Sequence, residues 1–262
     1  MEIKFHKYHG TGNDFILIDN RDNYFSADES TISGLCDRRF GIGADGLILL
    51  EQCPGFDFRM LYFNSDGRES TMCGNGGRCI TAFADFLSLI PDHAKFIGPD
   101  GEHTGHIVSR NGTQSIVRLS LRNVNDIRLL NEDYILNTGS PHLVRFVKDV
   151  ELIRVAEEGR KIRNLPDYQP AGINVNFVTV KEGKLHVRTY ERGVEDETLS
   201  CGTGVTASAI AYAHRNEIQQ GTVQIVARGG QLELDFRKND KVFTDIFLQG
   251  PAARVFSGII QI

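Results

Sequence analysis

Apolar runs separated by turn residues fill the first half of the chain and predict a series of short β-strands. These strands are expected at residues 2–8, 15–20, 46–52 and 58–64. After the second of them, Ser26 and Glu29 stand at the spacing of a capping box, which predicts the start of a short helix. The run that follows Cys73 is long and apolar, so we expect a further helix there.

The second half of the chain has a clearer β rhythm, with strands expected in two pairs. The first pair spans 175–180 and 185–190, and the second spans 223–228 and 231–236. Gly229-Gly230 joins the second pair as a two-residue hairpin signal. Because connections this short cannot form parallel crossovers, the pattern predicts mainly antiparallel sheets with helices packed on them, an α+β fold.

The two halves repeat the same order of features. HGTGNDF and TGSPH are turns that precede Cys73 and Cys201 by nearly the same interval. In each half a strand that ends in polar residues then leads to a Cys-Gly-x-Gly stretch and an apolar helical run. This duplication predicts two similar domains related by a pseudo-twofold axis. We expect one domain at 1–115 together with 248–262, and the other at 116–247.

Composition narrows the classes of partner. The chain has 262 residues and a net charge of -5, so it carries no excess of positive charge for nucleic acid or anionic lipid. Its start lacks the pattern of a signal peptide, and no apolar run is long enough to span a membrane. We therefore expect a cytoplasmic protein whose five scattered cysteines are reduced thiols.

Cys73 and Cys201 each stand directly before a Gly-x-Gly turn at the start of a helix. A helix N-terminus presents unpaired N–H groups and a partial positive charge, which can bind a carboxylate and stabilise a thiolate. A single such cysteine is more often buried and inert. The repeated context favours a chemical role for these two.

For the remaining cysteines, Cys36, Cys53 and Cys79, the inert interpretation stands. A zinc site is not expected, because a Cys-x5-Cys pair on one helix lacks the usual ligand spacing. GNGG is also not part of a P-loop or Rossmann sequence.

A set of motifs spans nearly the whole chain in order: HGTGNDF, GIGADGL, FNSDGRESTMCGNGGRC, GSPH, NVNFV, YERGVEDETLSCGTG and GPAARVF. Together they resemble the diaminopimelate epimerase family, for which MCGNG combined with GTGNDF is highly specific. The resemblance implies two pseudo-symmetric domains, each a curved, mainly antiparallel sheet around a central helix, with the active site between them. It also implies a cytoplasmic homodimer that acts on a small molecule in lysine and peptidoglycan precursor biosynthesis.

The family interconverts LL- and meso-diaminopimelate without pyridoxal phosphate, metal or another cofactor. The resemblance therefore implies a two-base reaction, in which one thiolate removes the α-proton and the other thiol returns a proton to the opposite face. It assigns catalysis to Cys73 and Cys201, and support of catalysis to His142 and Glu191. The residues that it implies for substrate binding are Asn13, Asn64, Gly74, Asn75, Asn174, Glu191, Arg192, Gly202 and Thr203.

Three positions depart from the family pattern. Ser140 stands where the family often has Asn, Gly46 where it often has Gln, and Gly77 where it often has Ala or another residue. A serine hydroxyl reaches less far than an amide, and Gly46 has no side chain to offer a substrate.

Other functions remain open at this stage. A proline or hydroxyproline racemase-type enzyme of the same fold also uses two cysteines beside Gly-x-Gly turns, although it typically has His where Asn75 stands. A Cys-His hydrolase would use Cys73 as nucleophile and His142 as base. A module that only binds diamino acids would show affinity without exchange of the α-proton.

Overall fold

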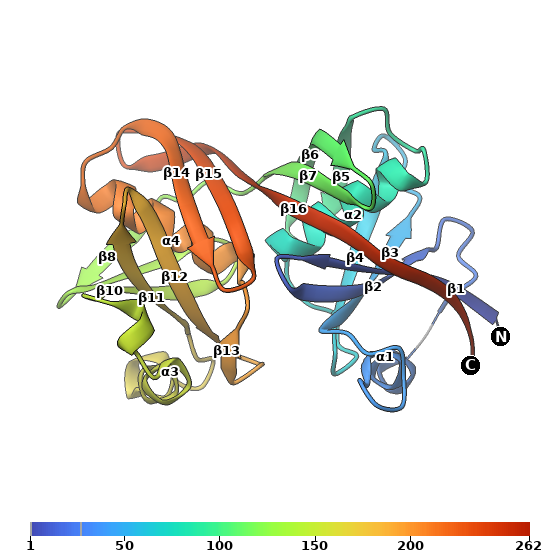
Figure 1. Ribbon diagram of the computed structural model, residues 1–262, viewed down its shortest axis with the longest axis horizontal. Helices are drawn as coiled ribbons and strands as arrows, with labels where there is room; N and C mark the ends of the chain where they lie inside the picture. Colours follow the sequence, from blue (N-terminus) through green and yellow to red (C-terminus); the bar gives the residue numbers. More distant parts are fainter. Residues whose placement is uncertain (1, 27) are drawn as a thin grey trace. The chain divides into compact units, whose positions relative to one another are not determined.

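The chain folds into two compact units in the computed structural model, which describes residues 2–26 and 28–262. Unit 1 contains residues 1–119 and 250–262, and unit 2 contains residues 120–249. The last strand, β16 (Val242–Gln261), begins in unit 2 and ends in unit 1 (Figure 1). Strands outnumber helices in both units, so the fold is α+β, as predicted.

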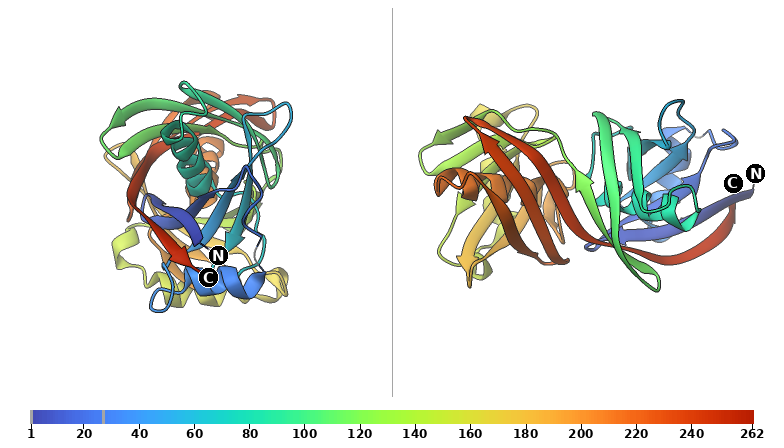
Figure 2. Two further views of the ribbon diagram at one scale, coloured as in Figure 1. Left: turned by 90° about the vertical axis from the view of Figure 1, so that its right-hand side faces the viewer. Right: turned by 90° about the horizontal axis from the view of Figure 1, so that it is seen from above.

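Unit 1 is a ring of strands that surrounds one helix. Its strands are β1 (Glu2–Gly10), β2 (Asn13–Asp19), β3 (Gly46–Glu51), β4 (Phe58–Asn64), β5 (His93–Gly98), β6 (Gly101–Asn111) and β7 (Gln114–Ser120). They neighbour one another in chain order, and the end of β16 pairs with both β7 and β1. Helix α2 (Gly74–Phe86) lies inside this ring (Figure 2).

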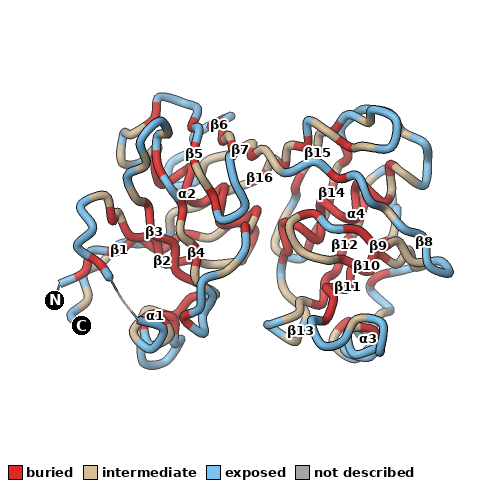
Figure 3. Tube along the Cα trace, turned by 180° about the vertical axis from the view of Figure 1, so that it is seen from behind, coloured by how far each residue is buried: buried red, intermediate tan, exposed pale blue. Residues whose placement is uncertain are grey.

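Helix α2 can lie inside the ring because it has glycine where a strand packs closely against it. Nearly all of its residues are buried (Figure 3). A Cβ added to Gly77 would lie 2.6 Å from side-chain atoms of Leu119 and Met72, so glycine allows the helix to approach β7 closely. This contact is a physical reason for glycine, rather than a residue with a Cβ, at this position.

Unit 2 repeats the plan of unit 1. Its strands are β8 (Ile127–Leu130), β9 (Asp133–Asn137), β10 (Pro141–Phe146), β11 (Asn174–Lys181), β12 (Lys184–Glu191), β13 (Asp196–Thr198), β14 (Gln220–Ala227), β15 (Gly230–Asn239) and the start of β16. The order along the sheet is β16-β15-β14-β12-β11-β10-β9-β8. Helix α4 (Gly202–Arg215) is mostly buried against this sheet, and its apolar side chains form the core of the unit.

The two units share their parallel strand pairs as well as their antiparallel ones. In unit 1, β2 and β3 are parallel and flank α1 (Glu29–Cys36), and β4 and β5 are parallel and flank α2. In unit 2, β10 and β11 flank α3 (Val155–Arg163), and β12 and β14 flank α4 in the same way. The remaining pairs are antiparallel, so the prediction of mainly antiparallel sheets is confirmed, but it missed these crossovers.

Two local predictions were wrong in detail. The N-cap of α1 is Asp28, whose carboxylate accepts a hydrogen bond from the Thr31 amide, so Ser26 does not cap this helix. In the hairpin of β14 and β15, Ala227 pairs with Gly230, so the loop is Arg228-Gly229 rather than Gly229-Gly230. Among the described residues, no helix combines the length and the hydrophobicity that crossing a membrane requires.

Candidate functional site

Each unit places a cysteine at the N-cap of its internal helix. Cys73 precedes α2 and Cys201 precedes α4, and both have extended backbone angles. Neither side chain caps its own helix. Both cysteines stand beside first-turn N–H groups that carry the positive end of the helix dipole. This geometry suits a thiolate or the carboxylate of a ligand.

Glycine is required beside Cys201. A Cβ added to Gly204 would lie 2.4 Å from the side-chain oxygen of Asn176 and 3.3 Å from the sulfur of Cys201. The Gly-x-Gly turn therefore lets the strand β11 and the thiol approach the first turn of α4.

In unit 1, Cys73 contacts Asn13, and Asn13 in turn contacts Asn75; the sequence predicted both asparagines. Cys73 Sγ lies 3.6 Å from Asn13 Oδ1, and Asn75 Nδ2 donates to the same oxygen at 3.2 Å. Asn13 enters from the start of β2, directly after the tight turn at Thr11 and Gly12, where both residues have positive φ. The structure thus brings Asn13, Cys73 and Asn75 together.

A buried cation, Arg78, fixes the orientation of the Asn75 amide. Arg78 is fully buried and donates to Asn75 Oδ1 at 2.8 Å, and it also donates to Gly74 O at 3.2 Å. Burial lowers the pKa of Arg78 to about 10, so it remains charged at neutral pH. Because a guanidinium only donates, the side-chain oxygen of Asn75 must face Arg78 and its nitrogen must face Asn13.

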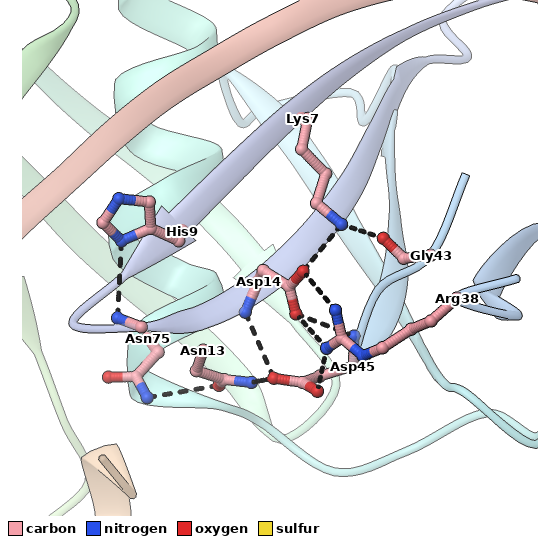
Figure 4. Close-up of polar contacts among 9 residues, drawn as sticks. Lys7, His9, Asn13, Asp14, Arg38, Gly43, Asp45 and Asn75 are labelled. Carbon is pink, nitrogen blue, oxygen red and sulfur yellow. Dashed lines mark hydrogen bonds and ion pairs between the residues drawn. The ribbon is translucent and has the colours of Figure 1, made fainter. Parts of the chain in front are cut away.

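The amide of Asn13 is fixed from the other side by a cluster of charges (Figure 4). Asn13 Nδ2 donates to Asp45 Oδ2 at 2.7 Å, and Arg38 bonds to Asp45 and Asp14 at 2.7 Å each. Lys7 completes the cluster by pairing with Asp14 at 2.7 Å. Hydrogen bonds and ion pairs with Arg38 and Lys7 outweigh burial and lower the pKa of Asp14 to about 2.

In unit 2, Cys201 belongs to a chain of polar groups. Cys201 Sγ lies 3.5 Å from Thr203 Oγ1, and His142 Nε2 lies 3.0 Å from the same hydroxyl. His142 is fully buried on β10. Burial, assisted by the charge of Arg192, lowers the pKa of His142 to about 3, so this imidazole is neutral at physiological pH.

A second group in unit 2 gathers around Asn174 on β11. Its Nδ2 donates to Ser140 Oγ at 2.8 Å, and its Oδ1 accepts from the backbone N–H of Arg192 at 3.0 Å. Ser140 therefore hydrogen-bonds within the unit despite its short reach. Glu191, which precedes Arg192, accepts a hydrogen bond from the hydroxyl of Thr198.

Asn64 and Gly46 lie opposite each other on β4 and β3. Asn64 is exposed at the end of its strand. A Cβ added to Gly46 would lie 2.4 Å from Phe63 O and 2.7 Å from the ring of Tyr62, so the strand has no space for a side chain there. The departure from glutamine at this position thus follows from the close approach of β3 to β4.

Sequence reasoning missed three residues that position the predicted ones: Asp45, Arg78 and Asn176. Arg78 is the only basic residue of α2 and lies among small and apolar residues, which is a signal of a buried partner. Asn176 stands two residues after Asn174 on β11, so both side chains lie on one face of the strand. Asp45 stands in GIGADGL, a motif quoted as a whole without assigning this carboxylate.

The other cysteines lie away from helix N-termini. Cys36 and Cys79 are buried, and burial raises the pKa of Cys36 to about 12 and that of Cys79 further. Both are therefore protonated at neutral pH. Within residues 2–26 and 28–262, no group of three or more His, Cys, Asp or Glu side chains is arranged to hold a metal ion.

Comparison with known proteins gives one consistent family. The family model described as diaminopimelate epimerase matches residues 5–113 and 134–255. A diaminopimelate epimerase of Flavobacterium psychrophilum is 49% identical over 260 residues, covering 98% of this chain and 100% of the relative. A diaminopimelate epimerase of Chlorobaculum tepidum is 38% identical and covers 97% of this chain and 99% of the relative.

Solved structures share the fold at low sequence identity. A PhzF-family phenazine biosynthesis protein of Bacillus anthracis has a TM-score of 0.79 at 14% identity and covers 100% of both chains. A hydroxyproline epimerase of Agrobacterium vitis has a TM-score of 0.76 at 14% identity and covers 99% of this chain and 92% of that one. These likenesses show the fold and nothing finer.

Proposed function

The chain belongs to the diaminopimelate epimerase family, and from that premise we propose that it interconverts LL- and meso-diaminopimelate through a thiolate and a thiol. One sulfur takes the α-proton, so a C–H bond breaks and an S–H bond forms. The other sulfur returns its proton to the opposite face of the carbon, which restores a C–H bond with inverted configuration. No electrons are exchanged, and the two sulfurs finish with their protonation states interchanged.

The observation that carries this proposal is the repeated N-cap cysteine. Cys73 and Cys201 each stand at the start of a buried helix that supplies oriented backbone N–H groups. Negative charge that develops next to the substrate carboxylate is stabilised by such groups without reorganisation. The reaction needs acid-base groups on both faces of one carbon, and two equivalent thiols meet that need.

The remaining residues have roles in binding the substrate within the same proposal. Asn13 and Asn75 beside Cys73, and Asn174 and Thr203 in unit 2, offer amide or hydroxyl groups to the ammonium and carboxylate groups. Arg192 suits a carboxylate because a guanidinium can bind it with two parallel hydrogen bonds. Asn64, Gly74, Glu191 and Gly202 complete the proposed binding set, with His142 and Glu191 supporting catalysis.

The proposal also covers the setting of the reaction. The enzyme acts as a cytoplasmic homodimer, needs no added cofactor, and supplies a precursor of lysine and peptidoglycan. Size measurement in solution by light scattering tests the dimer, and turnover by purified protein after dialysis against chelator tests the cofactor independence.

The decisive experiment incubates the protein with LL-diaminopimelate in heavy water and follows the isomer ratio and the label at the α-carbon. We expect both the meso isomer and deuterium to appear. Proline and hydroxyproline serve as comparison substrates, and exchange on them in place of diaminopimelate would favour the racemase alternative. Binding without deuterium incorporation would contradict an enzymatic role.

Cysteine variants test the two thiols separately. Cys73→Ala and Cys201→Ala should each abolish epimerisation, and circular dichroism should show that both remain folded. Cys53→Ala is the matched control, because this cysteine lies outside the helix N-termini. Near-normal turnover by either of the first two variants would refute the two-base reaction.

A further inference from the structure

A continuous chain of polar groups leads to Cys201 through the buried side of unit 2. Asn176 Nδ2 lies 3.2 Å from His142 Nδ1, and His142 Nε2 lies 3.0 Å from Thr203 Oγ1. Thr203 Oγ1 in turn lies 3.5 Å from the sulfur of Cys201. Asn176 and His142 have no exposed surface.

The orientation of the Asn176 amide is determined by its two outer partners. Its Nδ2 lies 2.9 Å from the carbonyl oxygen of Leu143, which only accepts, and its Oδ1 accepts from the hydroxyl of Thr189 at 2.9 Å. A flipped amide would set two oxygens against each other at the Leu143 contact. The second N–H of Nδ2 therefore points at His142.

This orientation selects one tautomer of the imidazole. Since Asn176 donates to Nδ1, that nitrogen must be the unprotonated acceptor, and the proton of the neutral ring lies on Nε2. Nε2–H then donates to Thr203 Oγ1. The hydroxyl, which receives this bond, directs its own hydrogen toward the sulfur of Cys201.

We propose that Asn176 is a positioning residue that holds His142 as a neutral Nε2–H donor, so that Thr203 donates a hydrogen bond to the thiolate of Cys201. His142 in this arrangement does not carry a proton to or from the substrate. Its role is to set the direction of the bonds that reach the sulfur. The significance for catalysis rests on the proposed function, but the arrangement itself does not.

The surrounding charges are compatible with a hydrogen-bonded relay of neutral side chains that runs from Asn176 through His142 to Thr203. Arg192 is the charge that acts on His142, and it disfavours a second proton on the ring. The first turn of α4 contains no acidic residue that would oppose a thiolate at Cys201. Glu191, the last residue of β12, accepts a hydrogen bond from the hydroxyl of Thr198.

The first test measures the tautomer directly. Two-dimensional ¹⁵N–¹H spectra of the histidine rings distinguish Nε2–H, Nδ1–H and doubly protonated forms, and the His142→Gln variant identifies the signals of His142. We expect a single Nε2–H pattern that does not change between pH 8 and pH 5. An Nδ1–H pattern, or protonation of both nitrogens within that range, would overturn the proposal.

The second test measures the thiolate of Cys201. The rate of alkylation by iodoacetamide is followed against pH and resolved for each cysteine by mass spectrometry, and the midpoint of the profile reports the thiolate independently of accessibility. Thr203→Val removes the hydroxyl and should raise the midpoint for Cys201 by about one pH unit, which is about a tenfold loss of thiolate below that midpoint. Thr203→Ser should restore the original midpoint.

The matched control is Thr206→Val on the same helix. Thr206 is also buried, but its hydroxyl donates to Gly202 O, so its loss should leave the midpoint of Cys201 unchanged. A midpoint that moves equally in both variants, or in neither, would overturn the relay.

Asn176→Asp tests the origin of the relay. A carboxylate beside Nδ1 accepts instead of donating, so the ring should switch to Nδ1–H and the Cys201 midpoint should rise as in Thr203→Val. If this variant does not fold, the spectra of the unaltered protein still decide the tautomer. Failure of the proposed function would appear differently, as intact tautomer and midpoint results in a protein that does not epimerise diaminopimelate.

Discussion

The side-chain oxygen of Asn13 lies 3.6 Å from the sulfur of Cys73. An amide oxygen only accepts, so in this contact the sulfur donates, as a thiol does. Beside Cys201 the partner is the hydroxyl of Thr203, which can donate to a thiolate. The two cysteines occupy equivalent helix N-termini but have neighbours of opposite hydrogen-bonding polarity. In the proposed reaction, this difference favours Cys201 as the thiolate and Cys73 as the thiol at the start of one direction.

Asp45 controls the polarity at Cys73, because its carboxylate holds the nitrogen of Asn13 and thereby turns the oxygen toward the sulfur. Asp45→Asn replaces that acceptor with a group that can also donate, so the amide of Asn13 loses its fixed orientation. We expect kcat for epimerisation to fall by roughly tenfold, as for loss of a hydrogen bond to a charged group. Steady-state kinetics in both directions measure this effect.

The matched control for this variant is Asp85→Asn. Asp85 forms a two-bonded pair with Arg110 in the same unit and makes no contact with Asn13. Its substitution should leave the rate close to that of the unaltered protein. Equal rates for the two variants would show that Asp45 does not position Asn13.

Arg78 supports the same amide network from within the helix. Arg78→Met would leave Asn75 Oδ1 and Gly74 O without this donor in a buried region, so we expect the free energy of unfolding to fall by about 2–4 kcal/mol. Urea denaturation measures the change. Arg110→Met, at an exposed arginine, should cost less than about 1 kcal/mol. Equal stability of both variants would contradict a structural role for Arg78.

The sequence predicted the features that depend on local chemistry. Apolar runs marked β1–β4, β11, β12, β14 and β15 but not β5–β10, β13 or β16, and the repeated Cys-Gly-x-Gly stretches located both internal helices. It did not predict the parallel pairs, because whether two strands flanking a helix become neighbours depends on contacts between distant residues. The N-cap of α1 was missed because Asp28 and Ser26 are both good caps and the local sequence does not decide between them.

The sequence motifs identified candidate site residues but not the residues that hold them in position. Motifs named Asn13, Cys73 and His142 directly. Asp45 and Asn176, which orient Asn13 and His142, lie far away in the sequence or on another strand. The pairing of strands brings these side chains into contact, and the sequence alone does not show that pairing. Gly46 illustrates the same limit, because its lack of a side chain follows from the approach of β4.

The buried His142 should make stability depend on pH. Its pKa is 6.5 when exposed in the unfolded chain but is lowered to about 3 by burial, so below pH 6.5 the unfolded state binds a proton that the folded state does not. The contribution to stability is complete above pH 6.5 and is lost as the pH falls toward 3. Between pH 7 and pH 5 the loss should reach about 2 kcal/mol, at about 1.4 kcal/mol per pH unit.

Comparison with His142→Gln isolates this contribution. Urea denaturation at pH 7, 6 and 5 should show a smaller decline for the variant than for the unaltered protein. His93→Gln, at an exposed histidine, should keep the full decline. Parallel pH dependence in the unaltered protein and the His142 variant would show that this imidazole titrates in the folded state.

Two glycines provide a paired test of how closely the strands of unit 1 pack. A Cβ at Gly46 would lie 2.4 Å from the backbone oxygen of Phe63, which cannot move without disturbing the pairing of β3 and β4. Gly46→Ala should therefore lower the free energy of unfolding by about 1–3 kcal/mol. At Gly34, within α1, an added Cβ meets nothing within 4 Å, so Gly34→Ala should raise stability by about 0.4–1 kcal/mol. Thermal and urea denaturation compare the two, and changes of the same sign would contradict the packing described for Gly46.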